Sequence, residues 1–357
     1  MMERIYINGR FLAQPITGVQ RYCRELLGTM DEMIEAGKLD MEGRELICLV
    51  PKSLMDYPNW KHIQIRPVGW LDGNLWEQFV LPWYVRDGLL FSPANIGPYV
   101  VPGQVVTMHD ASVFAMPEAY SWTFRLKYRL ILKHLGKTAK TIITVSQFSK
   151  GELVKHCGIK PDKIEVIPHG HEHLLKINPD PGIMKKYNLT QKPYFLAVGS
   201  NSPHKNIKVV LEAVALIPNP DFNLVIAGGS FGKVFAAQSL ELPENVIHVG
   251  YVTDSELRSL YEHARAFIFP SKYEGFGLPV LEALSFGCPV ISSNAASLPE
   301  VGGDAVAYFD PEGIEDMHNL LKDPIQSNLS LYVEQVHKFS WKQSVYQTWN
   351  LLKGFNF

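Results

Sequence analysis

Short apolar segments recur along the chain, and segments of helical length separate them. In the N-terminal half they lie at residues 4–8, 45–50, 89–92, 105–109, 141–145 and 165–167. In the C-terminal half they lie at residues 194–198, 223–227, 246–249, 266–269, 289–293 and 306–309. Apolar runs of strand length that alternate with helices are typical of parallel α/β units. The pattern therefore predicts two doubly wound parallel sheets of about six strands each, with ligands at the carboxyl ends of the strands.

A polar segment that contains Pro179 and Pro181 separates the two sets of predicted strands. The 357 residues are enough for two cores of roughly 150–180 residues each. We expect an N-terminal Rossmann-like domain over 1–171, a C-terminal Rossmann-like domain over 172–340, and a helix over 341–357 that packs back on the N-terminal domain. If the two sheets face each other with their carboxyl edges, the loops that follow their strands line one cleft.

Composition and charge exclude several classes of protein. A hydrophobic content of 46% and a charged content of 20% are ordinary for a folded globular chain, and a net charge of −2 argues against a basic nucleic-acid binder. The four cysteines lie far apart without a C-x-x-C pair, which favours reduced thiols over a disulfide framework or a zinc site. The N-terminal segment lacks the pattern of a secretory leader, and no window approaches the roughly 18–20 apolar residues of a membrane span. We expect a protein of the cytoplasm, or one at the inner face of the membrane.

The segment that begins at Glu274 reads E-G-F-G-L-P-V-L-E and ends at Glu282, so two carboxylates lie eight positions apart. Gly275 and Gly277 let the backbone approach a ligand closely and adopt a positive φ. Pro279 suits the first position of a helix, whose free N–H groups would face a phosphate or sugar oxygen. The alternative is a glycine-rich connection followed by a helix with solvated glutamates, which is the commoner fate of charged residues.

This segment resembles the E-x7-E motif of glycosyltransferase family 4, a family of retaining enzymes with the GT-B fold. Sequence blocks in the register of that family cover essentially the whole chain; they lie at residues 107–110, 144–149, 167–170, 199–206, 250–257, 267–271, 287–291 and 297–305. The resemblance implies two Rossmann-like domains that face each other across a cleft. It also implies a metal-independent hexosyltransferase that takes a nucleotide sugar as substrate and needs no cofactor.

By this resemblance, Glu282 binds the ribose of the donor and Glu274 binds the donor sugar. Backbone N–H groups of the glycine-rich loop would bind sugar and diphosphate oxygens; the loop residues are Gly275, Phe276, Gly277 and Leu278. Lys205 would neutralise the leaving diphosphate, a role that suits a compact ammonium. Gly199 and Ser200 belong to the same loop as Lys205. The family often has an arginine where Ser200 stands, so the expected phosphate clamp has one cation fewer.

Four further residues take expected roles from the family pattern. Val252 would lie against the nucleobase, and Gly18 would lie at the diphosphate end of the cleft. His109 would hydrogen-bond the donor sugar, and Asp110 would lie near the acceptor hydroxyl. A lone histidine at the end of a strand is more often structural in an α/β protein, which is the alternative for His109.

Three alternate histidines, His169, His171 and His173, would point one way on a strand and could hold a transition metal. The first of them stands where the family usually has asparagine, which favours a structural turn. The chain contains no D-x-D motif, and we expect no metal site. Lys205 and helix-terminal N–H groups would bind the diphosphate instead.

The segment 122–140 combines aromatic residues with six Lys or Arg, and its apolar residues recur at helical spacing. It could dock on a membrane surface, or it could be a helix that buries one face and solvates its basic side. We expect Trp70, Trp76 and Trp83 to lie in the core. The alternative is that they form a wall that binds the acceptor.

The chain is similar to bacterial mannosyl- and rhamnosyltransferases of surface-polysaccharide synthesis. This resemblance implies transfer of a hexose from GDP-mannose or a UDP-hexose to a glycan or polyprenyl-linked acceptor, in the synthesis of a surface polysaccharide such as lipopolysaccharide or capsule. Nucleic acid is not an expected partner. Two alternatives stay open. The first is a GT-B sugar-nucleotide epimerase, which would convert the donor without an acceptor. The second is a catalytically silent scaffold that binds glycan or lipid.

Overall fold

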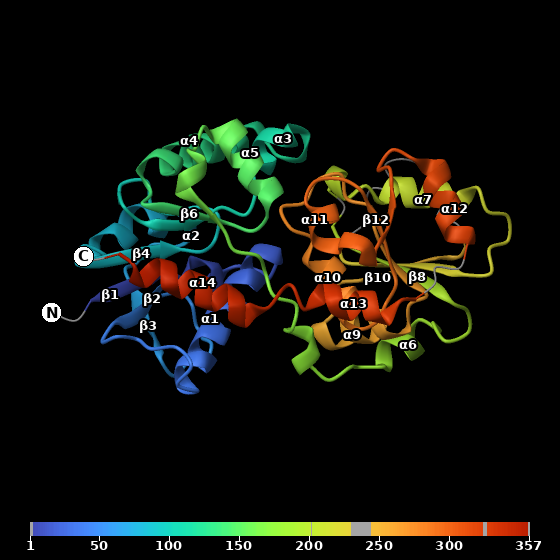
Figure 1. Cartoon of the computed structure of the whole chain (residues 1–357), viewed down its shortest axis with the longest axis horizontal. Coiled ribbons are helices and arrows are strands. Elements are labelled where there is room, and N and C mark those ends of the chain that lie inside the picture. The colour runs from blue at the N-terminus through green and yellow to red at the C-terminus, as the bar shows by residue number, and fades with distance from the viewer. Residues whose placement is uncertain (1–2, 201, 230–243, 324–326, 356–357) are drawn as a thin grey trace. The chain divides into compact units, whose positions relative to one another are not determined.

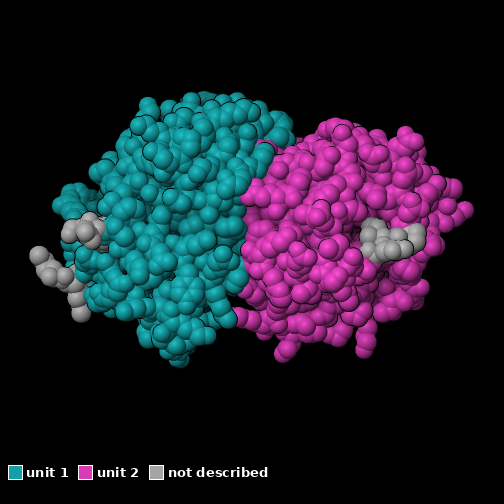
Figure 2. Space-filling model, in the orientation of Figure 1, with its two compact units in different colours: residues 1–170, 340–357 teal, residues 171–339 magenta. Residues whose placement is uncertain are grey.

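The computed structural model describes residues 3–200, 202–229, 244–323 and 327–355. The chain divides into two compact units, coloured separately in Figure 2. The N-terminal unit comprises residues 1–170 and 340–357, and the C-terminal unit comprises residues 171–339. Each unit contains one parallel sheet with helices on both faces, as the alternation of apolar runs predicts.

The sheet of the N-terminal unit has seven parallel strands in the order β3-β2-β1-β4-β5-β6-β7. Their bounds are β1 Arg4–Asn8, β2 Glu45–Pro51, β3 Ile63–Val68, β4 Gly88–Ser92, β5 Val105–Thr107, β6 Thr141–Thr144 and β7 Ile164–Val166. The apolar runs of the sequence predict six of these strands but not β3. This strand lies at the edge of the sheet, contains Arg66 and Pro67, and buries only its first and last residues. An edge strand of this kind lacks a continuous apolar run.

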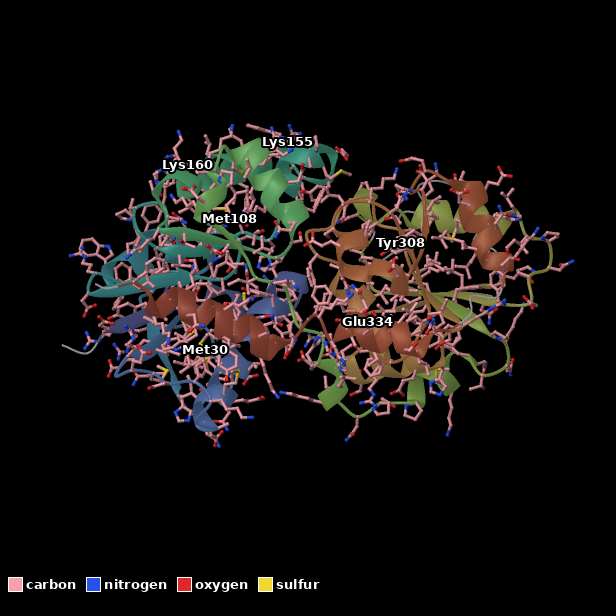
Figure 3. All side chains as sticks on the ribbon, in the orientation of Figure 1. Met30, Met108, Lys155, Lys160, Tyr308 and Glu334 are labelled. Carbon is pink, nitrogen blue, oxygen red and sulfur yellow. The ribbon has the colours of Figure 1, made fainter. Side chains whose placement is uncertain are left out.

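Helices cover both faces of this sheet. They are α1 Gly18–Glu35, α2 Gly73–Leu75, α3 Ser112–Ala115, α4 Trp122–Thr138, α5 Gln147–Cys157 and α14 Trp341–Lys353. Ile5 and Ile7 of β1 pack with α1 and α14 on one face, whereas Val106 of β5 packs with α4 and α5 on the other. In Figure 3, Met30 and Met108 lie within this unit, while Lys155 and Lys160 lie at its surface. The four cysteines of the chain are free thiols, and all are buried.

Among the residues described for the C-terminal unit, the sheet has six parallel strands in the order β10-β9-β8-β11-β12-β13. Their bounds are β8 Tyr194–Val198, β9 Asn223–Ala227, β10 Val246–Gly250, β11 Ala266–Phe269, β12 Val290–Ser293 and β13 Ala307–Phe309. All six were predicted from the sequence. The helices are α6 Gly182–Lys186, α7 Ile207–Ala215, α9 Asp254–His263, α10 Leu278–Ser285, α11 Leu298–Gly302, α12 Ile314–Lys322 and α13 Leu329–Val336.

The strand order of the C-terminal sheet determines where a ligand can bind. The chain starts the sheet at β8, builds outward to β9 and β10, and then returns to place β11 on the other side of β8. Ligands of doubly wound sheets bind at the carboxyl ends of the strands where the order reverses. The loops after β8 and β11 are therefore where a functional site is expected in this unit. Across the described ranges, we find no helix long and apolar enough to cross a membrane.

Candidate functional site

The loop that follows β8 is fastened to the loop that follows β11. Asn206 has a left-handed backbone with φ of 53°, and its Nδ2 donates to the carbonyl oxygens of Pro270 and Pro311 at 3.1 and 2.7 Å. The backbone N–H of Lys272 donates to the carbonyl oxygen of His204 at 2.7 Å. These hydrogen bonds hold two predicted site segments together at one edge of the sheet.

Lys205 and Glu274 form an ion pair at this edge. Nζ of Lys205 donates to Oε1 of Glu274 at 2.6 Å, and the two side chains are 20% and 16% exposed. The ammonium also lies 5.3 Å from the ring centroid of Phe269. The sequence assigned these two residues to the diphosphate and to the sugar of one ligand. A ligand that carries both phosphate and hydroxyl groups can reach this cation and this carboxylate together.

The glycine-rich loop turns sharply before α10. Gly277 has φ of 106°, and a Cβ there would lie 2.6 Å from Cδ2 of Leu298, so the conformation requires glycine. The hydroxyl of Ser297 lies 2.9 and 2.8 Å from the carbonyl oxygens of Glu274 and Phe276 and holds the loop from behind. Helix α10 begins at Leu278, one residue before the predicted Pro279. In its first turn Pro279 has no N–H, and the N–H of Val280 donates to the carbonyl oxygen of Gly277 at 3.0 Å, so this helix start offers a ligand fewer N–H groups than the sequence predicts.

Glu282 lies within α10 and is only 7% exposed. Nε2 of His173 lies 2.9 Å from its Oε1, and the hydroxyl of Tyr261 donates to its Oε2 at 3.1 Å. Burial, and secondarily the charge of Glu282, raises the pKa of Tyr261 well above its usual value, so the phenol stays protonated. The carboxylate of Glu282 is therefore held at both oxygens by side chains from other segments.

The alternate histidines do not converge on one point. His169 lies against aromatic rings of the N-terminal unit. Nδ1 of His171 donates to the carbonyl oxygen of Phe339 at 2.7 Å, and His173 contacts Glu282. Among the residues that the structure describes, no group of three or more His, Cys, Asp or Glu side chains could hold a metal ion. The sequence favoured a structural turn here and gave no signal for the contact between His173 and Glu282.

The remaining predicted residues of the C-terminal unit lie at the ends of β8 and β10. The backbone N–H of Gly199 donates to the carbonyl oxygen of Ala227 at 3.0 Å, and Gly228 donates to Gly250 at 2.7 Å. A Cβ at Gly228 would lie 2.5 Å from the carbonyl oxygen of Gly199, so these loops pack backbone against backbone. Ser200 is exposed and Val252 half-buried. Both border the carboxyl edge at which Lys205 lies.

His109, Asp110 and Gly18 belong to the N-terminal unit. His109 follows β5 and is buried, and its Nε2 lies 3.1 Å from the carbonyl oxygen of Pro93. Because a carbonyl only accepts, Nε2 carries the proton. Oδ1 of Asp110 accepts from the backbone N–H of Ser112, the first residue of α3, at 2.8 Å. Gly18 is the exposed first residue of α1.

Burial makes His109 a source of acid sensitivity. It lowers the pKa of His109 from 6.5 to about 4. The unfolded chain takes up this proton as the pH falls below 6.5, whereas the folded chain takes it up only near 4. The free energy of unfolding is therefore expected to decrease as the pH falls through this window, by at most about 1.4 kcal/mol per pH unit for one group. Denaturant unfolding at about pH 7 and about pH 5 measures this loss, and His109→Gln is expected to reduce it. If the wild type and the variant lose the same free energy of unfolding between these pH values, His109 is not the source of the acid sensitivity.

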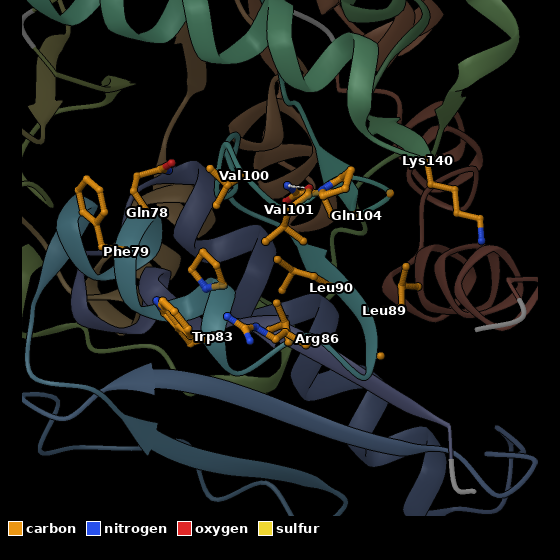
Figure 4. Close-up of a pocket in the computed structure, with 15 residues that line it drawn as sticks. Gln78, Phe79, Trp83, Arg86, Leu89, Leu90, Val100, Val101, Gln104 and Lys140 are labelled. Carbon is orange, nitrogen blue, oxygen red and sulfur yellow. Dashed lines mark hydrogen bonds between the residues drawn. The ribbon is translucent and has the colours of Figure 1, made fainter.

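A separate cavity of about 860 Å³ lies in the N-terminal unit, at the amino ends of β4 and β5. In Figure 4, Trp83 and Arg86 lie together along it, Phe79 lies at one end, and Lys140 lies at the other. The guanidinium of Arg86 lies 4.3 Å from the ring centroid of Trp83. None of the predicted site residues lines this cavity. The carboxyl edges of the two sheets remain the candidate sites for chemistry.

The three tryptophans divide between core and surface. Trp76 is fully buried, and its Nε1 donates to the carbonyl oxygen of Val68 at 2.9 Å, which confirms the prediction of a core residue. The prediction was wrong for Trp70 and Trp83, which are 84% and 66% exposed. Trp83 ends a short 3₁₀ helix, Leu81–Trp83, and the guanidinium of Arg86 lies over its ring.

Comparison with known proteins shows that this chain is similar to glycosyltransferases. The family profile described as glycosyl transferases group 1 matches residues 180–340, and the profile described as glycosyltransferase family 4 matches residues 99–173. O-antigen chain mannosyltransferase B of Escherichia coli is 30% identical over 95% of this chain and 96% of its own length. O-antigen chain mannosyltransferase RfbU of Salmonella typhimurium is 29% identical over 80% of each chain.

A solved structure extends the likeness to the fold. WaaG, a glycosyltransferase involved in lipopolysaccharide biosynthesis, superimposes with a TM-score of 0.70 over 99% of this chain and 100% of its own, at 19% identity. At this level of identity the likeness concerns the fold alone. It confirms the expected GT-B fold with its two Rossmann-like sheets.

Proposed function

Because the chain belongs to glycosyltransferase family 4, we propose that it moves a hexose from a nucleoside-diphosphate sugar to a hydroxyl of a glycan or lipid-linked acceptor, with retention of the anomeric configuration. The relatives are named as O-antigen mannosyltransferases, which supports GDP-mannose as the first donor to test and a UDP-hexose as the second. The product would be part of a surface polysaccharide.

The observation that carries the proposal is the arrangement of charge at the carboxyl edge of the C-terminal sheet. Lys205 and Glu274 pair there at 2.6 Å, beside the loop whose N–H groups lead into α10. Glu282 lies on the same helix, with both oxygens held. A nucleotide sugar carries a diphosphate, a sugar and a ribose diol. The ammonium suits the diphosphate, Glu274 suits the sugar hydroxyls, and Glu282 suits the ribose.

The proposed chemistry is electrostatic. The bond between the anomeric carbon and the diphosphate oxygen breaks, and the acceptor oxygen bonds to the same face of that carbon. An oxygen of the departing diphosphate accepts the proton of the acceptor hydroxyl. Lys205 and the backbone N–H of Leu278 at the start of α10 stabilise the negative charge that develops on the diphosphate. These groups supply positive charge at the diphosphate without a metal ion.

Two measurements test the proposal. Thermal unfolding in the presence of UDP, GDP, dTDP or ADP is expected to show one nucleotide that stabilises the chain in a concentration-dependent way. The matching nucleotide sugar is then incubated with and without a glycan acceptor. Sugar transfer that requires the acceptor supports a transferase, and conversion of the donor alone supports the epimerase alternative. Binding without either reaction would support a silent scaffold.

Glu282→Ala is expected to weaken binding of the stabilising nucleotide about 30-fold, because the ribose hydroxyls lose a charged acceptor. Isothermal titration calorimetry of the wild type and the variant measures the change. Glu300→Ala is a suitable control, since Glu300 is an exposed glutamate on α11 of the same unit. If Glu282→Ala binds the nucleotide as tightly as the wild type does, Glu282 is not part of the donor site.

We also propose that helix α4 contacts a membrane that carries anionic lipid. Its buried residues include Ile131, Leu132 and Leu135, but its outward face is not simply polar. Trp122, Leu126 and Leu130 are 71%, 52% and 59% exposed at intervals of four residues. Exposed lysines share the outward surface of this helix; they are Lys127, Lys133 and Lys137. Apolar side chains flanked by cations suit the boundary of an anionic bilayer.

Substitution of both Leu126 and Leu130 by glutamine is expected to reduce binding to vesicles that contain phosphatidylglycerol about tenfold, because two apolar side chains no longer enter the lipid. Co-sedimentation measures it. Leu216→Gln is the matched control, because Leu216 and Leu130 are both 59% exposed and Leu216 lies in the C-terminal unit. The proposal fails if the double variant binds like the wild type, or if phosphatidylcholine vesicles bind equally well.

A further inference from the structure

The segment that carries His173 is fixed at several points within the C-terminal unit. Nδ1 of His171 donates to the carbonyl oxygen of Phe339 at 2.7 Å. On the other side of His173, the carbonyl oxygens of Leu175 and Ile177 accept from the guanidinium of Arg258 at 3.3 and 2.6 Å. His173 is only 4% exposed. Its imidazole therefore reaches Glu282 from a backbone that is tied down before and after it.

Helix α9 acts on Glu282 by two routes. Arg258 fastens the turn after His173, and Tyr261 lies one turn further along the helix and donates directly to Glu282. Tyr261 is fully buried and its ring packs edge-on against Phe267 at 5.3 Å between centroids. The hydroxyl of Tyr261 thus has little freedom to leave Glu282. The two side chains that hydrogen-bond to the carboxylate, His173 and Tyr261, are therefore both held in place by their surroundings.

A carboxylate held in this way retains acceptor capacity. Each of its two oxygens has two lone-pair sites, and the protein occupies one on each oxygen through His173 and Tyr261. The remaining sites can accept two neighbouring hydroxyl groups. A carboxylate that is already oriented loses less conformational entropy when it binds such a pair. The geometry therefore favours a rigid 1,2-diol over a single hydroxyl.

We propose that His173 and Tyr261 are positioning residues that orient Glu282 to recognise the intact 2′,3′-diol of the donor's ribose. This inference rests on the proposed function, since it takes Glu282 as the residue that meets the ribose. It extends that function by assigning the recognition to three side chains from three segments. It also gives the first residues of the C-terminal unit, which include His173, a part in the choice of nucleotide.

The test compares nucleotides with and without one ribose hydroxyl. Calorimetry gives the dissociation constants of GDP and 2′-deoxy-GDP, and of UDP and 2′-deoxy-UDP, for the wild type and each variant. We expect the wild type to prefer the ribose form about tenfold, the gain from a hydrogen bond to a charged group. Tyr261→Phe and His173→Ala are expected to reduce this preference to about threefold or less. His173→Gln, which can place an N–H near Glu282, is expected to restore most of it.

Tyr194→Phe is the matched control. Tyr194 is equally buried, and its hydroxyl donates to the carbonyl oxygen of Leu260 on α9 at 2.7 Å, without a contact to Glu282 among its hydrogen bonds. We expect this variant to unfold at a lower temperature but to keep the wild-type preference for ribose. Thermal unfolding of every variant shows that it is folded. If His173→Ala does not fold, Tyr261→Phe and His173→Gln carry the test.

Two results would overturn the inference, and they differ. Equal weakening of ribose and deoxyribose forms in Tyr261→Phe and His173→Ala would show that these residues only support the fold. Unchanged affinity for the ribose form in Glu282→Ala would show instead that the proposed donor site is wrong. Loss of the ribose preference in Tyr261→Phe, His173→Ala and Glu282→Ala, but not in His173→Gln or Tyr194→Phe, supports the inference.

Discussion

Replacing Lys205 by alanine is expected to lower the rate of sugar transfer about 10³-fold, because the leaving diphosphate then loses its principal cation. The loss should fall mainly on kcat, since the charge on the diphosphate grows as the bond to the sugar breaks. The position of Ser200 strengthens this expectation. The family often has a second cation at this position, whereas this chain has only a hydroxyl. Lys205 therefore carries a larger share of the positive charge that neutralises the diphosphate.

Lys208→Ala is the matched control for this variant. Lys208 lies on α7, three residues beyond Lys205, and pairs at the surface with Glu212 at 3.3 Å. Removing it changes the net charge equally but touches no predicted site residue. Steady-state transfer assays of the two variants give kcat and KM. Loss of less than about tenfold in Lys205→Ala, or an equal loss in Lys208→Ala, would contradict the assignment of Lys205.

Replacing Glu274 by glutamine is expected to change two properties in opposite directions. Transfer should fall about 10²-fold, because the carboxylate no longer binds the sugar or stabilises positive charge at its anomeric carbon. Binding of the free nucleoside diphosphate should tighten about threefold to tenfold. The reason is that Glu274 pairs with Lys205 at 2.6 Å, and its removal leaves the full charge of Lys205 to the phosphates.

Calorimetry with the free nucleotide and transfer assays with the nucleotide sugar separate these two effects. Glu212→Gln serves as the control, since it removes the partner of Lys208 in the surface ion pair on α7. It is expected to change neither property. If Glu274→Gln binds the free nucleotide more weakly than the wild type does, Glu274 does not compete with the diphosphate for Lys205.

The fold could be predicted from the sequence because its signals are local. Of the thirteen strands in the described part of the chain, twelve coincide with apolar runs between turn residues. Parallel sheets buried on both faces produce such runs. The missed strand, β3, is an edge strand with mixed exposure. The turn at Gly277 was equally local, since the glycines and Pro279 predict it directly. The start of α10 was misplaced by only one residue.

The site was predictable only in part, because some of its contacts join distant segments. His173 and Glu282 are 109 positions apart, and nothing in either segment indicates that they meet. Ser297, which holds the glycine-rich loop, was missed for the same reason. The sequence also did not predict that Trp70 and Trp83 are exposed. A large aromatic residue favours burial on average, but its actual place depends on which way its backbone turns.

We propose that the donor binds at the carboxyl edge of the C-terminal sheet, between Lys205 and Glu282. Amide hydrogen exchange, measured by mass spectrometry with and without the most stabilising nucleotide, tests it most directly. We predict slower exchange in peptides that contain residues 203–206 and 274–282, and no change in the cavity-lining segment 78–104. Unchanged exchange in 274–282, or protection confined to 78–104, would show that the donor does not bind at this edge.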